Sequence, residues 1–338
     1  MGLYKTEVPV TSQDNAEQTR AMGEALGKVL LKVTGDPRTL ANPQLQQAMA
    51  AAKNYVSGFS YRRDSTENPD NQAHYYLQVS FVDTAVNKLL RDSGMAIWGA
   101  NRPTTLAWLA IEDSDGRQIQ PNDPDNTLVN SIDQQFKERA LPVIFPTMDL
   151  EDRSALSPVD VWGVFSDKIE TASARYAAEA MLVGRLTLSN GRYNGRLSLL
   201  FRQQRQDAEV TDLDQIQLAK AAADLVGSTL ASHYAVALLA SSEQVAIRVE
   251  QVTSSQDYSA LLNYLATLTA VKSMQVNRVK DTSVDILLTI NGYRNQLVDA
   301  IALGRSLRRL PDNSPPPQSG TQPGARPTVP MLLYRWAQ

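Results

Sequence analysis

Apolar residues recur at helical spacing near the start of the chain, over roughly twenty residues after Asp14. The stripe consists of Met22, Leu26, Val29, Leu30 and Val33. Spacings of three and four place these side chains on one face of an α-helix, which predicts a helix that packs against a core. A strand is predicted before this helix, at 3–10, and Gly35 followed by Pro37 ends the helix. A helix after 42–43, strands near 55–63 and 74–82, and a helix from 83 to 94 complete a small α+β domain predicted over residues 1–98.

A second set of patterns follows a candidate linker at 99–103. An apolar run at 104–111 is typical of a buried strand, and further strands are predicted at 141–145, 180–188 and 192–201. Helices are predicted around 128–136 and 162–169 and over 212–239. Asn190-Gly191 favours a tight hairpin turn, because both residue types tolerate positive φ angles. We therefore predict a second α/β domain over residues 104–240.

The last third of the chain has the clearest order of elements. A strand is predicted at 244–252, a helix at 257–268, a hairpin at 271–279 and 283–290, and a helix at 296–303. This β-α-β-β-α order is typical of a ferredoxin-like unit, which we predict over 241–310. Residues 311–330 are rich in Pro, Gly, Ser and Gln and are predicted to form a linker to a strand-like tail at 331–338. The predicted class is α+β, with three small α/β sandwich-type domains in tandem.

Composition narrows the chemistry that the chain can perform. Its 338 residues include 33 basic and 36 acidic side chains, two histidines and no cysteine. Without cysteine there is no thiol nucleophile, disulfide or zinc–thiolate site, and two histidines leave little scope for a histidine-based metal site. No apolar run reaches the roughly 18 residues of a membrane span. No segment is basic enough to indicate a nucleic-acid partner. We predict no cofactor and no catalytic residues.

Neither histidine belongs to a recognisable catalytic pattern. A Ser/His/Asp triad would need His74 or His233 as its base, and the chain has no Gly-x-Ser-x-Gly elbow. His74 begins a predicted strand. His233 lies near the end of the predicted long helix, where its positive form suits the helix dipole. We interpret both side chains as structural.

An acidic loop at 112–125 is the candidate for a metal or ligand site. Its candidate ligands are the carboxylates of Asp113, Asp115, Asp123 and Asp125, and Glu112 precedes them. Such oxygen ligands suit Ca²⁺ or Mg²⁺, and Asp113-Ser114-Asp115-Gly116 begins like a calcium loop, but the later ligand positions are not filled in register. Solvated turn residues are the simpler interpretation, so no metal site is predicted. A ligand- or cation-binding envelope protein, including a hydrolytic one, stays open as the alternative function.

Two further groups are candidates for contact with a partner protein. Basic residues alternate on the predicted hairpin at Arg185, Arg192 and Arg196. They form either the solvated face of an antiparallel hairpin or a surface for an anionic glycan or an acidic partner. RNA binding by this surface is a third class of function, and it predicts strongly salt-dependent affinity for polyanions.

The second group is the apolar end of the tail. Its members are Leu333, Tyr334, Arg335 and Trp336. An aromatic, strand-like segment after twenty linker residues suits addition to a sheet edge, either in this chain or in a neighbour.

Several motifs together resemble the Gram-negative bacterial family known as domain of unknown function 2066. They are LLKVTGD at 30–36, AIWGANRP at 96–103, LAWL at 106–109, LPVIFP at 141–146, MDLED at 148–152, LVGRL at 182–186 and LYRW at 333–336. The resemblance implies a periplasmic location and brings no accepted activity or catalytic residues. The order of elements in the middle domain is similar to that of the amino-terminal domain of TolB and of the LpoB and CsgG cores, and the first domain resembles the amino-terminal module of FlgT.

The start of the chain fits the same location. Met1-Gly2 is followed directly by strand-like residues, without a charged or apolar leader. Either the protein is cytosolic, or a signal peptide has been removed and Met-Gly added. We expect the second, because the absence of cysteine suits an oxidising compartment. The sequence thus predicts a non-enzymatic periplasmic adaptor or scaffold that contacts other proteins of the cell envelope.

Overall fold

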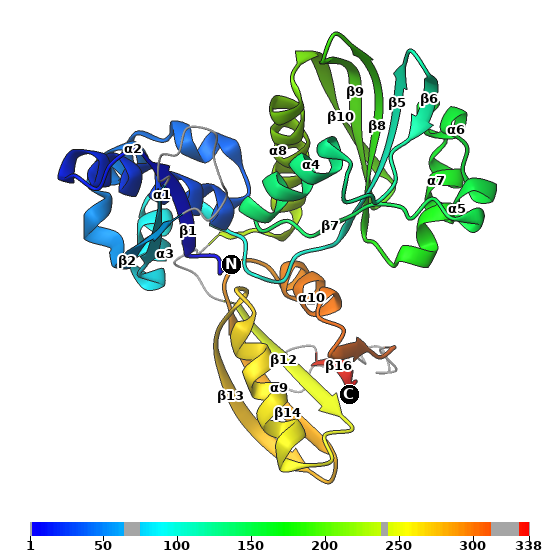
Figure 1. Ribbon diagram of the computed structural model, residues 1–338. Helices are drawn as coiled ribbons and strands as arrows, with labels where there is room; N and C mark the ends of the chain where they lie inside the picture. Colours follow the sequence, from blue (N-terminus) through cyan, green and yellow to red (C-terminus); the bar gives the residue numbers. More distant parts are fainter. Residues whose placement is uncertain (1, 64–74, 238–242, 312–330, 338) are drawn as a thin grey trace. The chain divides into compact units, whose positions relative to one another are not determined.

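The computed structural model describes residues 2–63, 75–237, 243–311 and 331–337, which form two compact units. The first unit comprises residues up to Ser93 together with Arg102–His233, and the second comprises Gly94–Asn101 together with the chain from Tyr234 onward. Both combine sheets with helices (Figure 1), so the predicted multidomain α+β class is confirmed. The predicted first and second domains thus share one unit. His74, the predicted loop at 64–71 and nearly all of the predicted linker lie outside the described residues.

The amino-terminal part of the first unit pairs a small antiparallel sheet with helices. Its elements are β1 (Lys5–Val10), α1 (Asn15–Thr34), η1 (Pro37–Ala41), α2 (Pro43–Ala50), η2 (Ala52–Tyr55), β2 (Val56–Arg63), β3 (Tyr75–Phe81) and α3 (Asp83–Asp92). The strand order is β1-β3-β2. Helix α1 begins where the Asp14 carboxylate accepts a hydrogen bond from the backbone N–H of Glu17, and it ends at Gly35 with φ of 76°. The predicted apolar stripe of α1 is buried.

The remainder of the first unit is built on a six-stranded sheet. Its elements are β5 (Thr105–Asp113), β6 (Gly116–Ile119), α4 (Thr127–Glu138), β7 (Val143–Ile144), α5 (Leu150–Ala155), α6 (Pro158–Trp162), α7 (Ser166–Ser173), η3 (Ala174–Tyr176), β8 (Ala180–Ser189), β9 (Arg192–Phe201), β10 (Gln204–Leu213) and α8 (Gln215–Tyr234). The order is β10-β9-β8-β5-β6, with β7 also paired to β5. Figure 1 shows α4 and α8 on one side of this sheet and α5 to α7 on the other. Strand β10 is therefore an edge strand.

Buried cations join the two parts of the first unit. Arg102 donates one hydrogen bond to the carbonyl of Arg139 at 2.8 Å and another to the carbonyl of Lys32, and Arg139 donates to the carbonyl of Gly35 at 3.3 Å. These carbonyls end α4 and α1, where the helix dipoles are negative, so the guanidinium groups are well placed. Gly227 of α8 packs on the same turn, because a Cβ there would lie 2.8 Å from the Gly35 carbonyl oxygen.

The second unit carries a five-stranded sheet. Its elements are β4 (Ala96–Ile97), β11 (Val236–Ala237), β12 (Glu243–Glu250), α9 (Ser255–Thr267), β13 (Val271–Lys280), β14 (Ser283–Ile290), α10 (Arg294–Leu303), β15 (Leu307–Arg309) and β16 (Met331–Trp336). The sheet order is β13-β14-β12-β16-β15. The predicted β-α-β-β-α order is present as β12-α9-β13-β14-α10. Strands β15 and β16 extend it.

The segment at 94–101 packs with the second unit, so the predicted domain boundary at residue 98 differs from the observed division. Strand β4 pairs antiparallel with β11, and the ring of Trp98 stacks on that of Tyr234 at a centroid distance of 6.4 Å. Asn101 donates a hydrogen bond to the carbonyl of Ala300 at 2.8 Å. Among the described residues, no helix combines the length and apolar character that a membrane crossing requires.

Candidate functional site

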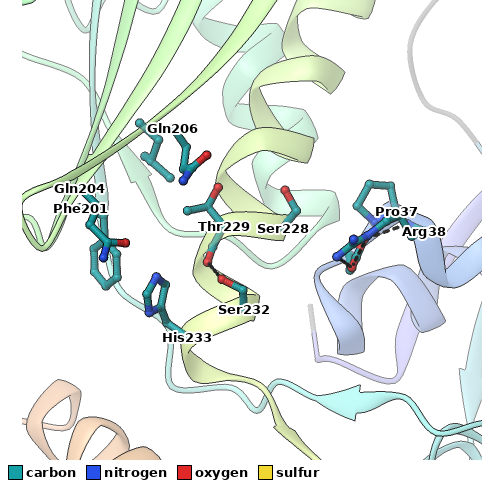
Figure 2. A pocket seen from close by; sticks show the side chains of 11 residues that line it. Pro37, Arg38, Phe201, Gln204, Gln206, Ser228, Thr229, Ser232 and His233 are labelled. Atoms are coloured by element: carbon teal, nitrogen blue, oxygen red, sulfur yellow. Dashed lines mark hydrogen bonds and ion pairs between the residues drawn. The ribbon is translucent and has the colours of Figure 1, made fainter.

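A polar groove of about 490 Å³ lies in the first unit, between α8 and the end of the β9–β10 hairpin. The lining residues come from the start of η1 and the residue before it, from β9 and β10, and from the second half of α8. The lining residues are Asp36, Pro37, Arg38, Leu199, Phe201, Gln204, Gln206, Ser228, Thr229, Ser232 and His233. Figure 2 shows His233 beside Phe201 and Gln204, with Pro37 and Arg38 on the far side of Ser228.

The β9–β10 turn brings the glutamines into the groove. Arg202 and Gln203 form the turn with φ angles of 50° and 60°, values that β-hairpins usually obtain from Asn or Gly. The turn sets Gln204 opposite Phe201 in the antiparallel register. Because side chains alternate along a strand, Gln204 and Gln206 face the same side, above the apolar floor. The hairpin thus supplies two amide side chains from the edge strand of the sheet.

His233 forms one end of the groove, in the last turn of α8. Its ring is partly exposed and meets the ring of Phe201 edge-on at a centroid distance of 5.2 Å. Within the described part of the chain, the imidazole has no hydrogen-bond partner, and the same holds for the amides of Gln204 and Gln206. These side chains keep their hydrogen-bonding capacity for a bound molecule.

The hydroxyl groups beside His233 are already committed to the helix. Ser228 Oγ donates to the carbonyl of Asp224 at 2.6 Å, and Ser232 Oγ donates to the carbonyl of Thr229 at 2.7 Å. A serine nucleophile must instead give its proton to a base within hydrogen-bond reach. The arrangement therefore suits recognition of a ligand better than acyl transfer.

Arg38 and Asp36 form the opposite rim. The guanidinium pairs with the carboxylate through Nη2 at 2.6 Å, and the Arg38 side chain is 85% exposed. Asp36 also accepts the backbone N–H of Arg38 at 2.9 Å, which caps η1. Hydrogen bonds from Arg38 lower the pKa of the Asp36 carboxyl. The rim therefore carries a compensated ion pair rather than a net charge.

The acidic loop does not assemble into one site. The carboxylate of Asp113 accepts the backbone N–H of Asp115 at 2.9 Å, and that of Asp123 accepts the N–H of Asp125 at 2.9 Å. Strand β6 separates these two turns. In the ranges that the structure describes, no group of three or more His, Cys, Asp and Glu side chains is placed to hold a metal ion. Asp123 does line a second cavity, of about 340 Å³.

The arginines of the predicted hairpin surface make local contacts. Arg185 of β8 lies directly opposite Arg196 of β9. Arg196 pairs with Glu209 of β10 at 3.3 Å, and Arg192 donates to the carbonyl of Asp212 at 3.3 Å. Residues of even number in β9 alternate with those that line the groove, so Arg196 lies on the other face of the sheet.

The four tail residues lie in β16, inside the sheet of the second unit. Tyr334 is 1% exposed and belongs to the core of that unit, and Trp336 packs against it while partly exposed. Leu333 and Arg335 alternate with these positions and face the other side. Of the two options left open by the sequence, the structure shows the tail docked on its own chain.

The fold is that of a mixed α+β multidomain protein with a polar groove in its first unit. The family comparison adds a match for the amino-terminal part alone, because residues 1–99 match the family described as Domain of unknown function (DUF8605). Comparison with the curated proteins finds no match, and comparison with the solved structures finds none. The predicted membership in domain of unknown function 2066 was therefore wrong, and the comparisons give no support to the resemblance of the middle domain to TolB, LpoB and CsgG.

Most of the groove was missed in the sequence. Of the lining residues, only His233 was considered for a chemical role, and the sequence favoured a structural role for it as a complement to the helix dipole. Gln204 and Gln206 carry no motif, and the turn before them lacks the Asn or Gly that usually marks a hairpin. A signal was present in the polar run 202–207 after the apolar end of β9, which indicates a chain reversal.

Proposed function

We propose that this chain is a non-enzymatic adaptor that binds an extended segment of a partner protein along β10 and in the groove. One observation carries the proposal: the groove adjoins the edge strand of the six-stranded sheet. An edge strand presents a row of backbone N–H and C=O groups that another strand can pair with. Proteins commonly recognise peptides in this way, with main-chain hydrogen bonds for affinity and side-chain pockets for specificity.

The length and exposure of β10 support strand addition. The strand has ten residues, most of them exposed. A partner strand added beyond β10 would place every second side chain on the groove side. There it would meet the amides of Gln204 and Gln206, the hydroxyl of Thr229 and the imidazole of His233. Small polar side chains that donate and accept hydrogen bonds match this lining best.

The state of the hydroxyl groups supports binding without covalent chemistry. Ser228 and Ser232 donate to helix carbonyls, and the His233 ring rests on Phe201 without a carboxylate to orient it among the described residues. A general base usually needs such an orienting partner. We expect mass spectrometry of a bound peptide to find it unmodified after prolonged incubation.

The proposal retains the cell envelope as the place of action. Its support is the absence of cysteine from all 338 residues, which avoids mispaired thiols in an oxidising compartment. Fractionation of cells that carry the natural gene tests this part separately. Recovery of the protein with the periplasmic fraction is expected, and recovery with cytoplasmic enzymes would refute the location without touching the binding site.

The binding site is tested with a phage-displayed library of ten-residue peptides selected on the full chain. Fluorescence polarisation then measures the affinity of labelled selected peptides for three proteins. Thr229→Arg fills the groove and should weaken binding at least tenfold. Ile216→Arg is the matched control, because Ile216 lies on the same helix, is 68% exposed and is outside the groove.

Two results would overturn the proposal. One is a selection that yields no peptide with a dissociation constant below about 100 μM. The other is equal affinity of selected peptides for Thr229→Arg, Ile216→Arg and the unmodified chain, since peptides would then bind elsewhere. Thermal unfolding of both variants must match the unmodified chain, and if Thr229→Arg is unstable, His233→Ala replaces it with an expected loss of about threefold.

A further inference from the structure

The carboxyl-terminal strand β16 is inserted between two strands that precede it in the chain. Its neighbour on one side is β12, to which it runs parallel with Ile247 opposite Leu332 and Val249 opposite Tyr334. On the other side it runs antiparallel to β15, with Leu307 opposite Trp336. The last element of the chain is thus an inner strand of the sheet, not an edge strand.

Without β16, the rest of the second unit has the complete order of a ferredoxin-like fold. Strands β12, β13 and β14 pair as β13-β14-β12, and β15 follows α10. Because β15 is antiparallel to β16 and β16 is parallel to β12, β15 is antiparallel to β12. It therefore has the direction needed to pair with β12 directly. The sheet can close over four strands when β16 leaves.

The slot between β12 and β15 recognises β16 through alternate side chains. Leu332 is 4% exposed and Tyr334 1% exposed, and both belong to the core of the second unit. On the side of β15, two backbone hydrogen bonds hold β16. The N–H of Leu310 donates to the carbonyl of Leu333 and the N–H of Ala337 donates to that of Ser306, both at 2.9 Å. A strand in this slot must therefore present apolar or aromatic residues at every second position.

Two features weaken the hold of β16 on its own chain. The buried Tyr334 hydroxyl has no hydrogen-bond partner among the residues that the structure describes, and such a group costs stability. Arg335 lies directly opposite Arg308 of β15, where like charges repel, and its register partner on the other side, Glu250 of β12, offsets part of this repulsion. The contact with β15 covers three residue pairs only. The apolar side chains of β16 therefore fit the slot, but its contacts with the sheet are not the most stable possible.

We propose that β16 exchanges between copies of this chain, so that the tail of one molecule fills the slot of a second. A second copy of the chain is the partner that fits, because it carries the same slot between β12 and β15. That slot already matches β16 in register and in side chains. The twenty residues between Leu310 and Met331 span at most about 70 Å when extended, enough to reach a neighbour. This inference concerns the second unit and does not depend on the groove.

The absence of cysteine makes a direct test possible. Arg308→Cys and Arg335→Cys are made as separate single variants, since both positions are exposed and are register partners across β15 and β16. The two full-length variants are mixed, incubated and oxidised, and disulfide-linked peptides are identified by mass spectrometry. An exchanged strand gives a disulfide between position 308 of one chain and position 335 of the other.

The control pair is Lys280→Cys mixed with Arg335→Cys, because Lys280 is exposed on β13, at the opposite edge of the sheet. We expect the 308–335 link between chains at least tenfold above the control pair, and a slower rise of that link when Tyr334→Phe is added. A single chain that carries both cysteines should close its disulfide internally. The inference fails if the mixed single variants stay at the control level, or if the double variant does not close.

Discussion

The pH dependence of stability provides a sharp test of the buried cations in the first unit. Lys32 is 1% exposed, and its ammonium group donates to the carbonyl of Lys5 at 2.8 Å. Burial, reinforced by the neighbouring cations Arg102 and Lys28, lowers the pKa of Lys32 from 10.5 to about 8, against the opposing effect of Glu138. Lys32 should therefore lose its proton near pH 8, where an ordinary lysine is still fully charged.

The sign and size follow from linkage. Between pH 8 and 10.5 the unfolded chain keeps the Lys32 proton and the folded chain does not, so the free energy of unfolding rises with pH. With these two pKa values the rise between pH 7 and pH 9.5 is about 2 kcal/mol. Above pH 10, tyrosine residues with raised pKa values, such as Tyr264, reverse the trend because they stay protonated longer in the folded state.

Two assays measure the effect. Carbon-13 NMR of labelled lysine side chains follows the titration of Lys32 directly. Urea unfolding from pH 7 to 9.5 compares the unmodified chain with Lys32→Met, which should lose the rise of about 2 kcal/mol. Lys28→Met is the matched control on α1, where the side chain is 31% exposed, and it should keep the rise. A Lys32 titration near 10.5, or parallel pH profiles for all three proteins, would refute the reasoning.

Other outcomes are expected elsewhere in the molecule. Gly227→Ala should lower the free energy of unfolding by about 1 to 3 kcal/mol in urea titrations, because the new Cβ would lie 2.8 Å from the Gly35 carbonyl oxygen; an increase would contradict the close approach. Deletion of 331–338 should lower the melting temperature of the second unit by several degrees in calorimetry, since it removes the buried Tyr334 ring, whereas an unchanged melting temperature would assign the tail to a partner. Millimolar Ca²⁺ or Mg²⁺ should leave the melting temperature unchanged within about 1 °C, because carboxylates of the loop 112–125 are used in two separate turns; a clear rise would restore the cation-binding alternative.

Much of the fold could be predicted from local patterns. The stripe that includes Met22 and Leu26 marks α1, and Asn190-Gly191 marks the β8–β9 hairpin. In the second unit, the predicted order of strand, helix, hairpin and helix matches the observed elements. These elements are encoded over short distances, where hydrophobic period and turn chemistry determine the structure.

The elements that were missed depend on contacts far apart in the sequence. Strand β6 lies inside what was interpreted as an acidic loop, and it is defined by antiparallel pairing with β5. Strand β10 follows the turn at Arg202 and Gln203, which has positive φ angles without Asn or Gly. The strand-like tail was predicted, but its pairing with β12, about 85 positions earlier in the chain, was not. Pairings of this kind are decided by tertiary packing, which a local pattern does not contain.

The candidate site was hidden for the same reason. Its side chains come from η1, β9, β10 and α8, and they meet only when the two parts of the first unit pack together. The acidic and basic clusters were predicted as candidate sites because runs of charged side chains give a clear sequence signal. In the structure Asp113, Asp123 and Arg196 make local turns and pairs. Glutamine, threonine and serine carry little sequence signal, although they form most of the polar lining.

The most direct test of the proposed adaptor function is amide hydrogen exchange along β10, with and without a peptide selected on the full chain. Strand addition predicts that alternate amides within 204–213 exchange at least tenfold more slowly in the complex, while those of the opposite edge strand β6 are unchanged. A peptide that binds tightly yet leaves exchange along β10 unaltered would contradict the account.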